Sequence, residues 1–276
     1  MKSKWTAQIL PSVILIAVVS GVALAKTVLG SLGIWNDADV GHIGLNNYRV
    51  LTRPIESALR LSLELASVST LIAAVLGIIL AYLIHTKKRF SRILIVVTGI
   101  IVITPHIVSA VAFNFLLGDA GTLSRLWRPI SHTWPQFVAG PQWLAVIFDV
   151  AWKESAFIAL VLVASLPVYV EDLKGVARTL GAKPVQLVTK VLFPTTKHAL
   201  IISSGLAFIY SVGSYEAAWL LGRTYPEPLS VMTFRLFSNS DLGVRPQAYA
   251  SAVVSIVLIG FAAFAMSTII PRQLKS

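Results

Sequence analysis

"VARTLGAKPVQLVTKVLFP", residues 176–194, is an unusual stretch of this sequence, because long apolar runs lie on either side of it. It carries three basic residues, a central glycine at 181, and prolines at 184 and 194. The apolar residues at 173, 176, 177 and 180 share one helical face, and a glycine readily takes a positive φ. Proline suits the first turn of a second helix. We therefore predict two short amphipathic helices with a turn at 181–183.

The composition places this stretch in a membrane protein. Hydrophobic residues make up 56% of the 276 positions and charged residues only 13%, whereas about a quarter of a soluble domain is charged. The fold class is therefore an all-α membrane protein. The net charge of +11 reflects Lys and Arg kept in cytoplasmic loops, so we expect the lipid bilayer as a partner and no nucleic acid. Without cysteine, the chain has neither disulfides nor thiolate metal sites.

Six apolar segments come close to the roughly 20 residues that a transmembrane helix needs. They cover residues 9–29, 58–84, 93–117, 143–170, 199–222 and 248–270. The first could end in a signal-peptidase site at Ala23–Ala25, but we expect an uncleaved helix. Three charged residues interrupt the fourth, so residues 143–152 could instead form an interfacial helix that turns into the membrane near Lys153.

The distribution of basic residues predicts the orientation of these spans. With the N-terminus inside, the inner segments hold 13 Lys and Arg among 51 residues, and the outer segments hold 9 among 85. Positive charge is retained on the cytoplasmic side, which predicts that both termini lie inside, the N-in/C-in arrangement. The stretch 176–194 then lies in the cytoplasm, between the fourth and fifth spans.

This stretch resembles the EAA loop of binding-protein-dependent ABC importer permeases. In that pattern Glu-Ala-Ala is followed, after three residues, by Gly and, after nine more, by Ile-x-Leu-Pro. Ala177, Gly181 and Pro194 match the pattern outright, and Val191 and Phe193 match it in character.

The loop also departs from the family pattern at its first positions. Gly175 stands where the family has glutamate and Val176 where it has alanine, while Glu171 lies one helical turn earlier and is a candidate substitute. The resemblance implies a loop, residues 169–197, that couples the membrane helices to an ATPase. Its candidate residues are Glu171, Gly175, Val176, Ala177, Arg178, Leu180, Gly181, Ala182, Val191 and Pro194.

The resemblance extends beyond the loop, through "GLNNYRVL" (44–51), "TPHIVSAVAFNFLLGDAG" (104–121) and "AWKESAFIALVLVASLP" (151–167). It implies the type I ABC importer permease fold, called MetI-like, for residues 45–276. Residues 1–44 would add an N-terminal transmembrane helix and an outer loop. A permease of this kind lies in the bacterial cytoplasmic (inner) membrane as a multi-pass protein.

The same resemblance implies the partners. They are two ATP-binding subunits, a second, homologous but non-identical permease, and an extracytoplasmic solute-binding protein. The chain contains no G-x-x-x-x-G-K-[ST] phosphate loop. We therefore expect a transport subunit that is not an enzyme and binds no cofactor itself, with ATP and Mg²⁺ on the partner subunits.

Ionisable residues at membrane depth are candidates for function. For Glu64 we favour a pair with Arg60, and for Asp149 a pair with Lys153 at the membrane interface. The stretch "FIYSVGSYEAAWLLGRTYPEPLSVMTFRLF" (208–237) resembles the polyamine, ferric-iron, thiamine and aminophosphonate branch of the family. This stretch contains the candidate residues of the translocation pathway, which are Tyr210, Gly213, Ser214, Tyr215 and Glu216. For Glu216 a role in helix packing is an equal alternative.

Acidic and aromatic residues near this predicted pathway favour a cationic or amine-bearing solute, through charge and cation–π contacts. A polyamine or thiamine-like compound fits best. The acidic and aromatic residues in question are Glu64, Asp149, Glu154, Glu216, Tyr210, Tyr215 and Trp219. The alternative function is an autonomous secondary transporter, but such proteins usually carry more spans and inverted repeats. An intramembrane enzyme or a metal site lacks support, because the histidines at 42, 85, 106, 132 and 198 are scattered.

Overall fold

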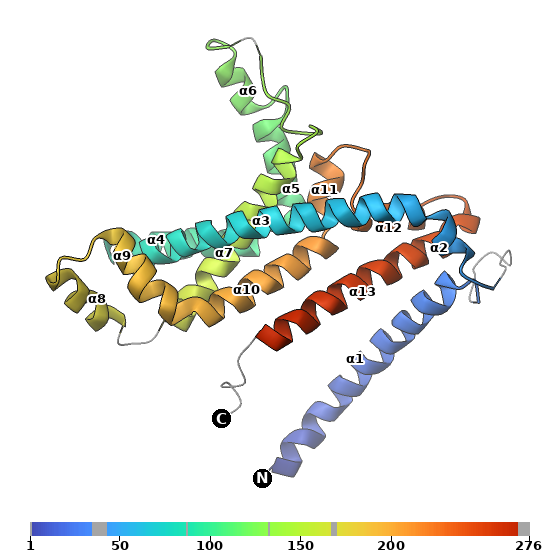
Figure 1. Cartoon of the computed structure of the whole chain (residues 1–276), viewed down its shortest axis with the longest axis horizontal. Coiled ribbons are helices and arrows are strands. Elements are labelled where there is room, and N and C mark those ends of the chain that lie inside the picture. Colours follow the sequence, from blue (N-terminus) through green and yellow to red (C-terminus); the bar gives the residue numbers. More distant parts are fainter. Residues whose placement is uncertain (1, 35–42, 87, 132, 167–169, 270–276) are drawn as a thin grey trace.

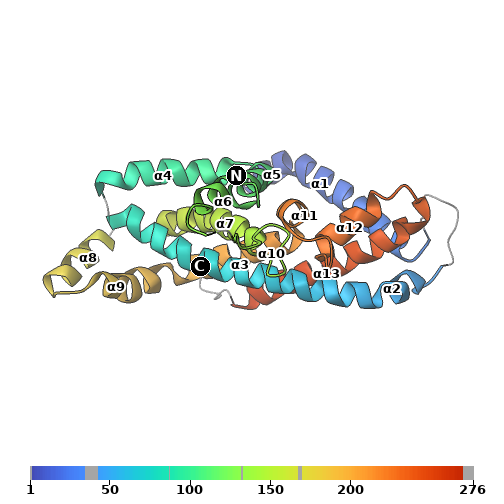
Figure 2. The same ribbon diagram turned by 90° about the horizontal axis from the view of Figure 1, so that it is seen from above.

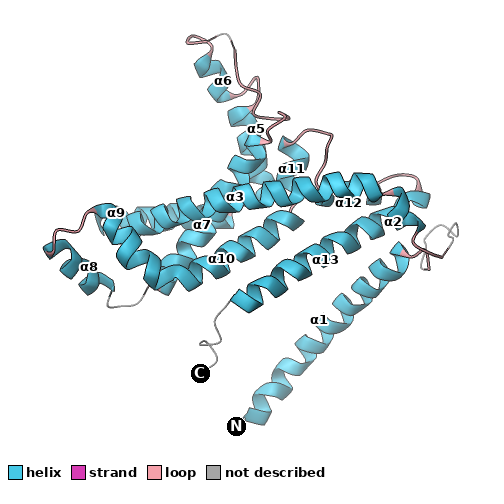
Figure 3. Ribbon diagram, viewed as in Figure 1, coloured by secondary structure: helices cyan, strands magenta, loops and turns pink. Residues whose placement is uncertain are grey.

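The computed structural model describes residues 2–34, 43–86, 88–131, 133–166 and 170–269, and within these ranges all regular structure is helical (Figure 3). The elements in chain order are α1 (Lys2–Ser31), α2 (Asn46–Val50), α3 (Thr52–Thr86), α4 (Lys88–Ile103), α5 (His106–Leu117), α6 (Thr122–Trp127), α7 (Leu144–Ser165), α8 (Val170–Thr179), α9 (Pro184–Leu187), the π-helix η1 (Val188–Leu192), α10 (Phe193–Gly213), α11 (Glu216–Leu221), α12 (Leu229–Phe237), the 3₁₀-helix η2 (Leu242–Val244) and α13 (Arg245–Ile269).

The 35-residue helix α3 is the central helix of the molecule, and α4, α7 and α10 pack along it (Figure 1). Helix α1 lies beside α13, and the N-terminal end of α1 and the C-terminal end of α13 point the same way (Figure 1). Helices α8 and α9 extend from the end of the molecule opposite α2 (Figures 1 and 2). The stretch 176–194 is thus far from α2 and α12.

Several helices are long and apolar enough to cross a membrane. They cover Leu10–Ser31, Thr52–His85, His106–Trp127 and Leu242–Thr268, and a fifth arises if Val185–Val191 and Phe193–Gly213 count as one bent span. The multi-pass expectation is confirmed. By this measure the described residues give four or five spans where the sequence predicted six, because α4 is short and α7 carries three charged residues.

The predicted third span, 93–117, is broken into α4 and α5. Helix α4 ends at Ile103 and α5 begins at His106, so Thr104 and Pro105 form the break. Proline has no N–H to continue the ladder, and it disfavours helical backbone at the residue before it. The predicted span is therefore two helices that meet at Pro105.

The predicted fourth span is one helix, α7, with no turn at Lys153. Asp149, Lys153 and Glu154 lie inside it and are 0%, 4% and 7% exposed. Because α7 continues through Lys153, the alternative of a separate interfacial helix at residues 143–152 that turns there is wrong. The charged groups are buried because they face neighbouring helices.

The predicted fifth span also ends earlier than expected. Helix α10 stops at Gly213, and after Ser214 and Tyr215 the short helix α11 begins at Glu216. Glycine is a weak helix former, and the Ser230 hydroxyl donates to the Ser214 carbonyl at 2.9 Å, which stabilises the break. The predicted fifth span, 199–222, therefore consists of two separate helices.

The apolar core lies along α3, where three clusters of buried side chains join it to its neighbours. One cluster joins α3 to α5, α7 and α11, a second joins it to α12 and α13, and a third joins it to α7 and α10. The third depends on Gly77, because a Cβ there would lie 2.7 Å from Ile158 Cγ2. Small residues let membrane helices approach closely, so Gly77 sets the α3–α7 distance.

Candidate functional site

The stretch 176–194 forms the helix–turn–helix that its pattern predicted. Helix α8 ends at Thr179, Gly181 has φ +78°, and α9 begins at Pro184. The Ala182 N–H donates to the Ala177 carbonyl, five residues earlier, at 2.9 Å, which is the bond of a Schellman motif at the C-terminus of a helix. The turn therefore requires a left-handed residue at 181.

The apolar side chains around this turn are exposed. Leu173, Val176, Leu180 and Val185 are 43%, 59%, 82% and 71% exposed, whereas Leu187 in α9 is buried. A loop that only covered its own helix ends would bury these side chains. Contiguous exposed apolar groups commonly mark an interaction surface, so we call Leu173, Val176, Leu180 and Val185 the loop surface.

The other predicted loop residues surround this surface. Gly175 is open, with no atom within 4 Å of a Cβ built on it, and Ala177, Ala182 and Val191 are half-buried. Pro194 lies in the first turn of α10, after the π-helix. The side chains of Glu171 and Arg178 lie outside the described residues, so a role of Glu171 in place of the missing glutamate stays a prediction.

A cavity of about 430 Å³ lies between α4, α5, α7 and α10. Its polar lining comes from His106, Lys153, Glu154 and Tyr210, and its apolar lining includes Phe157. The His106 and Tyr210 rings lie 4.6 Å apart. The sequence singled out these polar residues separately, but only the packing of four helices brings them together.

Lys153 bridges α7 to the break in the third span, since its Nζ donates to the Thr104 carbonyl. Carbonyls at the end of a helix lack intrahelical partners, and a cation there also suits the helix dipole. The predicted pair with Asp149 is therefore not formed, and neither Asp149 oxygen has a hydrogen-bond partner among the described residues. This expectation was wrong, because the Lys153 ammonium group contacts the carbonyl at the proline break instead.

The predicted pathway residues fall into two places. Tyr210 lines the cavity, whereas Tyr215 stacks on Phe234 of α12, with ring centroids 4.7 Å apart. The Ser214 hydroxyl donates to Glu216 at 3.1 Å, just beyond Gly213. Glu216 is thus held at the start of α11, which fits the packing alternative as well as a place on the pathway.

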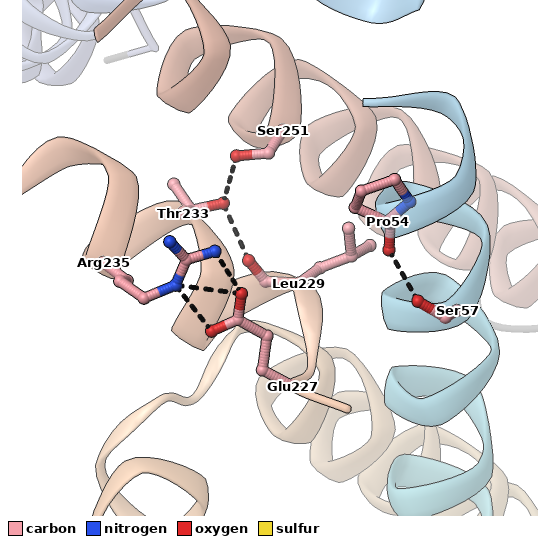
Figure 4. A network of polar contacts seen from close by, with 7 residues as sticks. All are labelled: Pro54, Ser57, Glu227, Leu229, Thr233, Arg235 and Ser251. Atoms are coloured by element: carbon pink, nitrogen blue, oxygen red, sulfur yellow. Dashed lines mark hydrogen bonds and ion pairs between the residues drawn. The ribbon is translucent and has the colours of Figure 1, made fainter. Parts of the chain in front are cut away.

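A network on the α12 side joins residues that the sequence did not bring together (Figure 4). The Arg235 Nε donates to both carboxylate oxygens of Glu227 at 3.0 Å, and this hydrogen bonding raises the pKa of Arg235 above its usual value. Thr233 Oγ1 lies 2.8 Å from the Ser251 hydroxyl and ties α12 to α13. The predicted Glu64–Arg60 ion pair is not formed between these two described side chains, which are both exposed.

The part of the chain that the structure describes holds no group of three or more His, Asp or Glu side chains suited to a metal ion. His42 and His132 lie outside the described residues.

The described residues thus form an all-helical core of membrane-length helices with an exposed helix–turn–helix, an arrangement that suits a transport permease. Residues 73–276 match the family described as binding-protein-dependent transport system inner membrane component. The match covers most of the chain, which therefore belongs to this family and has the MetI-like ABC importer permease fold. It is a transport subunit.

Named relatives in this family transport different solutes. The chain is 26% identical over 202 residues to a probable molybdenum ABC transporter permease of Haloferax volcanii, covering 73% of this chain and 69% of that protein. It is also 26% identical over 231 residues to the trehalose transport system permease SugA of Mycobacterium tuberculosis, covering 80% and 72%. Neither of these relatives is named for a polyamine, iron or thiamine, the solutes of the branch that the sequence suggested.

Two solved structures show the same fold. A bacterial alginate ABC transporter, in complex with an alginate pentasaccharide-bound periplasmic protein, matches with a TM-score of 0.72 and 19% identity, covering 95% of this chain and 93% of that one. The MetNI methionine ABC transporter in inward-facing conformations matches with a TM-score of 0.56 and 19% identity, covering 83% and 98%. At this identity the likeness concerns the fold.

Proposed function

We propose that this chain is one permease of an ATP-driven importer that receives a small solute from an extracytoplasmic solute-binding protein. The observation that carries the proposal is the loop surface, whose apolar side chains remain exposed around the Gly181 turn. Only a partner protein can bury these exposed side chains, and the partner that we propose is an ATP-binding subunit. It would hold ATP and Mg²⁺, and a second copy would sit under a homologous, non-identical permease.

The physical reason for this contact is transmission of movement. Closure of two soluble subunits on ATP moves membrane helices only through an element seated in each subunit. Helix α8 and its turn lead through α9 and the π-helix directly into α10. A displacement of the loop surface would therefore act on α10, which lines the polar cavity through Tyr210.

For the membrane arrangement we propose six spans with both termini in the cytoplasm of a bacterium. The third is the broken pair α4–α5, the fourth is α7, and the fifth is α10 with its bent start. The charges within α7 do not oppose this assignment, because they are buried against protein. Residues 45–276 form the permease core, and residues 1–44 add a helix and an outer loop.

For the solute we propose a small amine-bearing compound. The buried carboxylate of Glu154 and the ring of Tyr210 both line the cavity and suit an ammonium group through charge and cation–π attraction. The relatives named for molybdenum and trehalose do not favour this class. A polyamine or thiamine-like identity therefore rests on the acidic and aromatic residues near the predicted pathway and on the resemblance of residues 208–237 to that branch of the family.

The proposed coupling role is tested by introducing aspartate at each of two glycines in separate variants. Gly181→Asp puts a side chain at φ +78° and a charge in the proposed contact, so it should abolish uptake and release the ATP-binding subunit during purification. Gly175→Asp is the matched control, because its site is open and the family pattern carries an acid there. Full assembly and uptake by Gly181→Asp would refute the coupling role.

A further inference from the structure

The polar cavity between α4, α5, α7 and α10 carries both signs of charge side by side. Lys153 and Glu154 are consecutive residues, both almost completely buried, and both line this cavity with His106 and Tyr210. We propose that the cavity binds a zwitterionic solute, whose anionic group contacts Lys153 and His106 and whose ammonium group contacts Glu154 and Tyr210. The inference rests on the proposed import function and deepens it, because the amine-bearing solute would also carry an anionic group.

The unused hydrogen-bonding capacity of the cavity supports this assignment. A lysine ammonium has three N–H donors, and Lys153 uses one on the Thr104 carbonyl. His106 Nδ1 is buried and has no hydrogen-bond partner among the described residues. These groups can donate to an anion, and leaving them unmatched away from water is costly.

Glu154 supplies the opposite half of the site. Within the described ranges no hydrogen bond or ion pair is formed by its carboxylate, which is only 7% exposed. A buried carboxylate is stable as an ion only when it is paired. A solute ammonium group would supply that pair and would also contact the Tyr210 ring.

The apolar part of the lining limits what joins the two charged groups. Phe157, Leu206 and Ile209 form this part, and a volume of about 430 Å³ accommodates a small organic molecule. A short hydrocarbon segment therefore fits between the charged ends. A lipid with a zwitterionic headgroup offers the same chemistry, so the experiment must separate the two sources.

The test uses membranes that contain the assembled importer and measures labelling of Glu154 by dicyclohexylcarbodiimide, a reagent for carboxyl groups in apolar surroundings. Glu154→Gln identifies the label. The probes are γ-aminobutyrate, butyrate and butylamine, which share a four-carbon chain and differ in charge. We expect γ-aminobutyrate to slow labelling about fivefold, as it would at about four times its dissociation constant, and the other two to have little effect.

Variants of Lys153 show which group recognises the anionic end. Lys153→Gln keeps a donor for the Thr104 carbonyl but removes the charge, so the advantage of γ-aminobutyrate over butylamine should disappear. Lys153→Arg keeps the charge and should preserve that advantage. Retention of the ATP-binding subunit by each variant shows that the fold is intact.

The outcomes separate the possibilities. Equal protection by butylamine would mean a simple cation site, equal protection by butyrate an anion site, and no protection by any probe would also overturn the proposal. Membranes of phosphatidylglycerol alone exclude a zwitterionic headgroup, and protection that requires phosphatidylethanolamine instead of a probe would assign the cavity to lipid. An importer that still assembles with its ATPase but fails these tests refutes the cavity inference and leaves the proposed function standing.

Discussion

Arg235 of α12 donates from one nitrogen to both carboxylate oxygens of Glu227, which lies eight residues earlier and is almost completely buried (Figure 4). The pair fixes the loop between α11 and α12 to the last turn of α12. Glu227→Gln removes the charge from this hydrogen-bonded fork and should lower the free energy of unfolding by about 1–2 kcal/mol. Thermal unfolding of the purified protein checks this. Arg223→Gln, an exposed cation of the same loop, should leave the unfolding temperature unchanged.

The loop surface should contribute to assembly and hardly at all to stability. Leu180→Ser changes a side chain that is 82% exposed, so the free energy of unfolding should shift by no more than about 0.5 kcal/mol. Less ATP-binding subunit should nevertheless co-purify. Leu187→Ser, in the same segment, changes a buried side chain and should destabilise the permease itself. Equal retention of the ATP-binding subunit by the Leu180→Ser protein and the wild type would remove Leu180 from the contact.

The close approach of α3 and α7 should be sensitive to bulk at Gly77. Gly77→Val places a Cβ only 2.7 Å from Ile158 Cγ2, and such overpacking costs about 1–3 kcal/mol. Gly99→Val is the control, because no atom lies within 4 Å of a Cβ at that position. Unfolding temperatures of both variants in the same detergent give the comparison. If the two substitutions shift them equally, Gly77 has no special place in the packing.

Tyr210 offers a test of the cavity that does not alter its charges. Tyr210→Phe keeps the ring against His106 and removes the hydroxyl, so uptake should be nearly preserved, whereas Tyr210→Ala should reduce it several-fold through loss of the ring. Uptake by proteoliposomes containing the full importer measures both. Tyr215→Phe, which keeps the stack on Phe234 outside the cavity, provides the comparison at the second place. A stronger defect from Tyr215→Phe than from Tyr210→Ala would move the solute contact away from the cavity.

The membrane class and the helix–turn–helix could be predicted because each depends on local pattern. Long apolar runs indicate spans irrespective of their neighbours, and Gly181 between two amphipathic segments indicates a left-handed turn. The exposure of Leu180 could not be predicted, because an amphipathic face alone does not reveal whether its own chain covers it.

The breaks and the cavity depend on contacts between distant residues. Pro105 was visible in the sequence, but membrane helices tolerate proline when other groups satisfy the freed carbonyls, so the pattern did not decide between a kink and a break. The group that satisfies the Thr104 carbonyl comes from α7. For the same reason Asp149 and Lys153 had the spacing of an ion pair and yet did not form one.

The Thr104–Lys153 bond also has a consequence for biosynthesis, because its two partners are 49 residues apart and leave the ribosome in order. When α4 and α5 first meet the bilayer, the carbonyl at their junction has no lysine and must keep water as its partner. We expect α5 to remain hydrated until α7 has been inserted. A nascent chain that stops before Lys153 should leave Ala110→Cys open to a water-soluble maleimide, whereas the finished chain, in which Ala110 is 0% exposed, should protect it. Insertion of the third span would then be completed by the fourth.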